Sequence, residues 1–174
     1  LPMLLTSSMN YILNWIGIFI LGIFRPDWEV GVYDVAVKIS LITSLTLFSI
    51  NSIAAPKFAE LYAKKNMKSF QKIVSKSSKM IFWTSFPILL LIIAIPNYFL
   101  GFFGDEFIYG KFALIFLCCG QFINSLSGSV GYILQMTGQQ KVFQNIMIIS
   151  TIINILLNII LIPKFGINGA ALAS

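Results

Sequence analysis

The sequence predicts an all-α fold, a polytopic bundle of helices that crosses a membrane several times. Two observations predict it. Hydrophobic residues make up 57% of the 174 residues and charged residues only 10%, whereas soluble domains carry roughly 25% charged residues. Several apolar stretches also reach the roughly 20 residues that a helix needs to cross the hydrocarbon core of a bilayer. Lipid is therefore the expected surrounding of this chain.

About five and a half membrane spans are expected along the chain. Short segments that contain Pro, Gly or charged residues mark their limits. The predicted spans cover about residues 3–24, 32–55, 80–100, 112–136 and 142–162, and a truncated span covers 166–174. Pro87 and Pro96 favour kinks within the third span. Because both ends look cut, we expect residues 1–174 to be a partial transmembrane transporter domain of a longer chain.

The connecting segment 57–79 differs in kind from the other loops. It holds seven of the twelve Lys and Arg residues: Lys57, Lys64, Lys65, Lys68, Lys72, Lys76 and Lys79. Its apolar residues recur at helical spacing, which favours one or two basic amphipathic helices at the membrane interface; a solvated basic loop is the alternative. Short loops rich in Lys and Arg stay in the cytoplasm. Segment 57–79 is therefore predicted to be cytoplasmic, and loops 25–31, 101–106 and 163–169 to face outward.

The composition argues against catalysis. The chain has no His, and its six acidic residues lie mostly in loops, so a His-dependent triad, a His-ligated metal centre and a carboxylate metal cluster lack their parts. Cys118 and Cys119 are adjacent in an apolar segment, which fits neither a disulfide framework nor a zinc site. We therefore predict that the protein is not an enzyme, uses no cofactor or metal, and has no nucleic-acid partner.

Asp34 and Lys38 are the most informative charged residues. They are four residues apart in the predicted second span, so on a helix they share a face and can form an ion pair. A lone charge in lipid costs several kcal/mol, and such residues usually face a bundle interior or a water-filled pathway. In one interpretation Lys38 lines a central cavity and attracts an anionic headgroup, while Asp34 holds it in place. In the other, the pair reaches the outer membrane surface.

Uncharged polar residues are the remaining site candidates. Asn10 and Asn14 lie in the first predicted span, and Gln121 and Asn124 lie in the fourth. Amide side chains can hydrogen-bond between membrane helices, so these residues could serve helix packing. Alternatively, they line a hydrophilic path for sugars, whose hydroxyl groups need such partners. Both interpretations remain open at this stage.

A series of motifs resembles a known family. Leu21-Gly22 followed by Glu29–Ile39 (EVGVYDVAVKI) resembles a pattern of polysaccharide biosynthesis flippases, which belong to the multidrug, oligosaccharidyl-lipid and polysaccharide exporter superfamily. Ala55–Tyr62 (APKFAELY) is similar to that family's motif at the end of the eighth helix. Further similar strings follow in the same order: Phe103–Phe107, Gly131–Lys141 and Asn154–Ala171. Together the strings cover nearly the whole chain.

The resemblance implies both a fold and a function. The chain would be the C-terminal half of a two-bundle flippase, from about helix 7 into helix 12. Such a protein moves undecaprenyl-pyrophosphate-linked oligosaccharide, such as O-antigen, capsule or exopolysaccharide repeat units, across the bacterial inner membrane by alternating access. The resemblance also implies a cationic central cavity, and Lys38 is the candidate for its charge here. It further implies contact with membrane lipids and, as protein partners, polysaccharide polymerase and chain-length proteins. Family members often carry a charge in helix 7 before the LG motif, where this chain has Asn14 and Trp15.

Three alternatives stand beside the flippase. A drug or cation antiporter of the same superfamily would place carboxylates inside the bundle, and only Asp34 is a candidate. A membrane enzyme of polysaccharide assembly would have a long outer loop with catalytic or sugar-binding residues, whereas the predicted outer loops are short. The last alternative is a scaffold, or a fragment without activity of its own.

Overall fold

Helices account for nearly all of the structure, which confirms the predicted fold class. The computed structural model describes the backbone of residues 2–174 and the side chains from Ser8 onward, and this part of the chain contains no β-strand. The helices, in chain order, are α1 (Pro2–Phe24), α2 (Asp27–Ser40), α3 (Ile42–Ala63), α4 (Met67–Ala94), α5 (Pro96–Gly101), the 3₁₀ helix η1 (Asp105–Gly110), α6 (Lys111–Ser127), α7 (Val130–Met136), α8 (Gln140–Phe165) and α9 (Ile167–Ala173).

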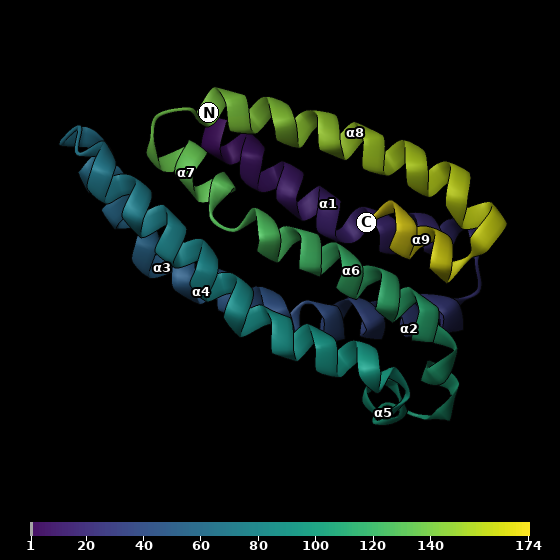
Figure 1. The fold of residues 1–174 in the computed structure, drawn as a ribbon. Helices are drawn as coiled ribbons and strands as arrows, with labels where there is room; N and C mark the ends of the chain where they lie inside the picture. The colour runs from purple at the N-terminus through teal and green to yellow at the C-terminus, as the bar shows by residue number, and fades with distance from the viewer. Residues whose placement is uncertain (1) are drawn as a thin grey trace.

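The helices pack as two layers joined by α6 and α2. Helix α1 packs along α8, and α9 folds back against α8 (Figure 1). Helix α3 packs along α4 on the other side of the bundle, and α6 lies between the two pairs, in contact with α4, α2 and α9. Helices that are far apart in the sequence therefore enclose a common interior.

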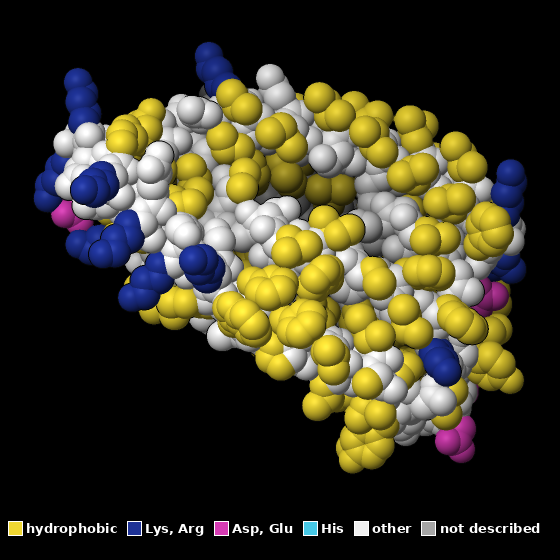
Figure 2. All heavy atoms as spheres, in the orientation of Figure 1, with side chains coloured by type: hydrophobic (Ala, Val, Ile, Leu, Met, Phe, Trp, Pro, Cys, Tyr) yellow, Lys and Arg dark blue, Asp and Glu magenta, His cyan; other side chains and the backbone are white. Residues whose placement is uncertain are grey.

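Four helical stretches are long and apolar enough to cross a membrane: Asp27–Ala63, Met67–Ala94, Asp105–Ser127 and Gln140–Phe165. A shorter apolar stretch, Ser8–Phe24, belongs to α1. A helix of 26 residues is about 39 Å long, which exceeds the roughly 30 Å of the hydrocarbon core. Large apolar side chains cover much of the outer surface of these helices (Figure 2), as a lipid environment requires. The chain is a multi-pass membrane protein.

The basic segment 57–79 is helical, as the spacing of its apolar residues predicts, and it forms the tip of a hairpin between α3 and α4. Helix α3 runs through Pro56, where the predicted span ended, and continues to Ala63. Proline removes one backbone hydrogen bond but need not end a helix that is packed on both sides of it. The extension is held because Phe58, which is fully buried, and Tyr62 both pack against Phe70 of α4, with ring centroids 6.0 Å apart in each case.

The turn of this hairpin is only three residues long. Lys65 adopts a positive φ of 54°, and the Asn66 side chain accepts a hydrogen bond of 3.1 Å from the backbone N–H of Ser69, which caps the N-terminus of α4. The helices expected in segment 57–79 are thus continuous with the neighbouring spans, as the projecting ends of α3 and α4 (Figure 1).

Two other predicted spans are interrupted. The span predicted at 80–100 breaks at Ile95, after which Pro96 starts α5; Pro87 lies inside α4 without ending it. The span predicted at 112–136 breaks at Gly128, which has a φ of +62° between α6 and α7. The loop lies so close to α4 that a Cβ on Gly128 would be 2.6 Å from the Ser78 hydroxyl oxygen. Only glycine combines this φ with that contact.

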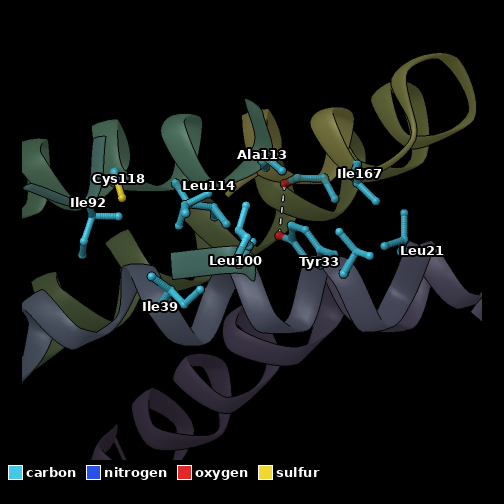
Figure 3. Close-up of a cluster of buried hydrophobic side chains, with 14 of the residues drawn as sticks. Leu21, Tyr33, Ile39, Ile92, Leu100, Ala113, Leu114, Cys118 and Ile167 are labelled. Atoms are coloured by element: carbon cyan, nitrogen blue, oxygen red, sulfur yellow. Dashed lines mark hydrogen bonds between the residues drawn. The ribbon is translucent and has the colours of Figure 1, made fainter. Parts of the chain in front are cut away.

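The core lies where α1, α2, α6, α8 and α9 meet. Leu21, Tyr33, Leu114, Cys118 and Ile162 are all buried there, and Figure 3 shows side chains of this cluster from several helices facing one another. The Tyr33 hydroxyl donates a hydrogen bond of 3.3 Å to the carbonyl of Ala170 in α9. This contact ties α2 to the end of the chain.

Candidate functional site

A cavity of about 390 Å³ opens between α1, α2, α6, α8 and α9, next to the core. In Figure 2 the surface is hollowed between α8 and α6, where this cavity lies. Binding sites for small ligands commonly have volumes of about 300–1,000 Å³. The cavity therefore has room for a molecule of the size of one or two sugar rings.

The cavity wall is polar but uncharged. Its polar residues are Asn14, Tyr33, Ser40, Gln121, Ser150, Asn154 and Ser174. Leu13, Val37, Leu117 and Ile153 are among the apolar residues between them. Among the residues that the structure describes, no Lys, Arg, Asp or Glu lines this space. Hydroxyl and amide groups both donate and accept hydrogen bonds, so the wall is suited to a neutral ligand that carries many hydroxyl groups.

Helix α8 contributes a polar stripe that also fixes α9. The Asn154 side-chain amide donates a hydrogen bond of 2.8 Å to the carbonyl of Ala173. The Asn158 amide donates to the backbone carbonyl of Asn154 at 2.9 Å and to its side-chain oxygen at 3.0 Å. Both residues are buried. The Asn154 side chain ties α9 to α8 and also lines the cavity, and Asn158 holds the Asn154 side chain in place.

Close helix packing shapes the opposite wall. A Cβ on Gly17 of α1 would lie 3.3 Å from the Tyr33 hydroxyl and 3.5 Å from the Asn158 side-chain oxygen. The Tyr33 hydroxyl also lies 2.9 Å from the Ser174 hydroxyl. A small residue at position 17 thus lets α1 approach α2 and α8 closely.

The structure brings together two of the six site candidates proposed from the sequence. Asn14 of α1 and Gln121 of α6 both line the cavity. The Gln121 side-chain oxygen accepts hydrogen bonds from the Ser44 hydroxyl at 3.0 Å and from the Asn124 amide at 3.4 Å. The Asn14 amide donates to the backbone carbonyl of Asn10 at 2.9 Å. Asn10 and Asn124 therefore neighbour the cavity residues but do not line the cavity themselves.

Asp34 and Lys38 form the ion pair that their spacing predicts, with 2.6 Å between Lys38 Nζ and Asp34 Oδ2. Neither residue lines the cavity. They lie on α2 beside the cavity residues Val37 and Leu41, and the Lys38 side chain is 68% exposed. The pair therefore occupies an exposed face next to the cavity rather than its interior.

Five polar cavity residues were not among the six site candidates: Tyr33, Ser40, Ser150, Asn154 and Ser174. One pattern could have indicated Ser150. It precedes Asn154 and Asn158 at intervals of four residues, so the three form one polar stripe along the otherwise apolar α8. Tyr33, Ser40 and Ser174 belong to no such pattern, so these positions carry no signal of their own.

Comparison with known proteins identifies the family. The MatE family model matches residues 2–160. The chain is 29% identical over 97% of its length to the probable low-salt glycan biosynthesis flippase Agl15 of Haloferax volcanii, and covers 36% of that protein. It is 26% identical over 99% of its length to the capsular polysaccharide biosynthesis protein CapF of Staphylococcus aureus, and covers 44% of it.

A third relative is the uncharacterized membrane protein MJ1068 of Methanocaldococcus jannaschii, with 28% identity over 81% of this chain and 28% of the relative. No solved structure matches the chain significantly. The chain spans less than half the length of each of these relatives. With a family model that covers most of the chain, and with two relatives named for glycan or polysaccharide biosynthesis, the chain belongs to the MatE family of the multidrug, oligosaccharidyl-lipid and polysaccharide exporter superfamily.

Proposed function

We propose that the protein is a flippase that exports lipid-linked oligosaccharides by alternating access, and that this chain forms one of its two helical bundles. The substrate in this proposal is an undecaprenyl-pyrophosphate-linked repeat unit of an O-antigen, capsule or exopolysaccharide, which moves across the bacterial inner membrane. The observation that carries the proposal is the uncharged polar cavity between α1, α2, α6, α8 and α9.

A polar cavity lowers the free-energy cost of moving sugars across a bilayer. Each sugar hydroxyl that enters hydrocarbon without a partner costs on the order of 2–7 kcal/mol, so an oligosaccharide cannot cross about 30 Å of bilayer unaided. A wall of amide and hydroxyl groups replaces the lost water contacts, while the apolar carrier lipid stays in the bilayer. We assign sugar contacts to Asn14 and Gln121, because both line the cavity from facing helices.

The headgroup needs a cation, and the proposal gives that role to Lys38. Its ammonium group is exposed on α2 next to the cavity residue Val37, and its ion pair with Asp34 positions it. Exposed ion pairs contribute only about 0–1 kcal/mol, so a pyrophosphate can compete with Asp34 for the ammonium group at little cost.

The same observations disfavour the antiporter and the enzyme. Proton or sodium coupling needs a carboxylate that faces the pathway, whereas Asp34 is paired outside the cavity and no other acid lines the cavity in the described part of the chain. The two relatives with functional names are called a flippase and a biosynthesis protein, and the first name supports a transporter.

The test uses the complete gene in its host. Deletion is expected to make lipid-linked repeat units accumulate on the cytoplasmic face while surface polysaccharide is lost. The wild-type gene should restore export, whereas a copy with Asn14→Ala and Gln121→Ala should restore little of it. Gln71→Ala, which removes an exposed amide on α4, is the matched control and should restore export fully. Unchanged polysaccharide with altered drug sensitivity would refute the flippase and favour the antiporter.

A further inference from the structure

The net charge of the chain resides at the tip of the α3–α4 hairpin. Residues 57–79 hold seven lysines and one acidic residue, Glu60, which gives this segment a charge of +6. The other residues hold five Lys or Arg and five Asp or Glu, and are neutral as a group. Figure 2 shows the lysines gathered at this end of the molecule, beyond the apolar surface.

The lysines of this segment fall into two sets. Lys57 and Lys64 each form an ion pair of 2.8 Å with Glu60. Within the described part of the chain, the other five lysines of the segment make no hydrogen bond or ion pair: Lys65, Lys68, Lys72, Lys76 and Lys79. Four of these five lie on α4 and are available for an anion from outside the chain.

Three of these free lysines line one face of α4 together with an exposed tryptophan. Lys72, Lys76, Lys79 and Trp83 follow one another at intervals of three or four residues, so they form a single row. The opposite side of α4 is buried, as its residues Ser77, Ile81 and Ser85 show. Each of them lies two residues from a member of the row, which is a rotation of about 200° around the helix. The row lines a groove of about 580 Å³ together with Ser75, Met80 and Thr84.

The row leads into an apolar groove farther along α4. Trp83 is 69% exposed, and tryptophan is enriched at the boundary between lipid headgroups and hydrocarbon. Leu90 lies two helical turns beyond Trp83 on the same face, and it lines a groove of about 560 Å³ between α4 and α6. The lining residues of that groove are Phe86, Leu89, Leu90, Ile93, Ala94, Cys119, Phe122 and Ile123. Along α4, lysines, a tryptophan and an apolar groove thus follow one another. A phospholipid presents its charged headgroup, its interfacial region and its acyl chain in the same order.

We propose that this face of α4 binds one anionic phospholipid of the surrounding bilayer. The lipid phosphate lies among Lys72, Lys76 and Lys79, and an acyl chain runs past Trp83 into the α4–α6 groove. Leu90 lies fourteen residues after Lys76, which corresponds to about 21 Å along the helix. This distance matches half of a bilayer that is about 40–45 Å thick with its headgroups. The site anchors the hairpin to the anionic leaflet, and it requires only that the chain lie in a membrane, not that it transport glycans.

The test measures lipid contact with Trp83 directly. The full-length protein is reconstituted in phosphatidylcholine vesicles that contain either brominated phosphatidylglycerol or brominated phosphatidylcholine, and Trp83 emission is isolated as the difference from a Trp83→Phe variant. Each lysine near a surface favours an anionic lipid by about fivefold in affinity. Brominated phosphatidylglycerol should therefore quench Trp83 with an apparent affinity at least fivefold above that of brominated phosphatidylcholine.

Two triple variants with equal charge separate a site from diffuse attraction. The triple variant Lys72→Gln, Lys76→Gln and Lys79→Gln should abolish the preference for the anionic lipid. The control variant Lys57→Gln, Lys64→Gln and Lys65→Gln, which removes the same charge from the end of α3 and the turn, should keep most of that preference. Equal losses in both variants, or no preference in the wild type, would overturn the proposal. Displacement of brominated phosphatidylglycerol by undecaprenyl pyrophosphate at a tenfold lower mole fraction would instead assign the groove to a transported lipid. The quenching of Trp83 does not depend on transport, so lipid binding at α4 can be established even if the flippase proposal fails.

Discussion

Substitution of Gly169 by alanine tests how tightly α9 must pack against α8. A Cβ on Gly169 would overlap the carbonyl oxygen of Leu161 and lie 2.6 Å from its carbonyl carbon. These are backbone atoms of α8, so no flexible side chain can move aside. The two helices must separate, and that movement also strains the hydrogen bonds that Ala173 and Ala170 of α9 accept from Asn154 and Tyr33.

The expected loss of stability follows from these contacts. Overpacking costs about 1–3 kcal/mol, and each of the two hydrogen bonds contributes about 1 kcal/mol. The higher helix propensity of alanine recovers up to about 1 kcal/mol. The net destabilisation is therefore about 2–4 kcal/mol, which corresponds to a fall in melting temperature of about 4–16 °C for a bundle of this size.

The assay is thermal unfolding of the full-length protein in detergent, followed by tryptophan fluorescence. Gly120→Ala is the matched control, because a Cβ there would meet nothing within 4 Å, and it should leave the melting temperature unchanged or raise it slightly. A Gly169→Ala variant as stable as the Gly120→Ala variant would refute the close α8–α9 contact.

Four further predictions address the cavity, the charges and the orientation. Asn14→Ala and Gln121→Ala should each lower the rate of glycan export about fivefold, since each removes about 1 kcal/mol of hydrogen bonding; full-rate export by both variants would exclude them from the pathway. Lys38→Ala should abolish export without reducing the amount of inserted protein on an immunoblot, and normal surface polysaccharide would reject its headgroup role. Asn158→Leu should destabilise the protein by about 1–3 kcal/mol in detergent unfolding, because it leaves the Asn154 side-chain oxygen without its buried donor; unchanged stability would show that this bond is dispensable. In a protein whose other cysteines are replaced, Asn66→Cys should react with an impermeant maleimide only in inverted vesicles and Asp105→Cys only in intact cells, while the reverse pattern would overturn the orientation.

Local helix geometry explains why some of the site was predictable. The Asp34–Lys38 pair forms as expected, because any helix places residues four apart on one face. A helix was expected after Pro56, but its continuity with the preceding span was missed, because it depends on packing of Phe58 and Tyr62 against Phe70 of α4. The break at Gly128 was missed for a similar reason, since it depends on the approach of the loop to Ser78.

The cavity was predictable only in its parts. Asn14 and Gln121 were candidates as polar residues in apolar spans, but they lie on α1 and α6. Only the packing of both helices against α2 and α9 brings them to one space. The same packing leaves Lys38 on an exposed face of α2, although it is only one residue from Val37 in the cavity wall.

The sequence by itself determined that this protein is a helical membrane bundle, approximately where its helices lie, and where its excess positive charge is concentrated. These properties follow from composition, hydropathy and the period of the helix. Only the tertiary structure decided which faces meet, which polar groups share a cavity and which lysines stay free. In a membrane, the lipid-facing and the buried sides of a helix are both apolar, so hydropathy cannot tell them apart, and close contacts such as that of Gly169 with Leu161 select the faces that pack.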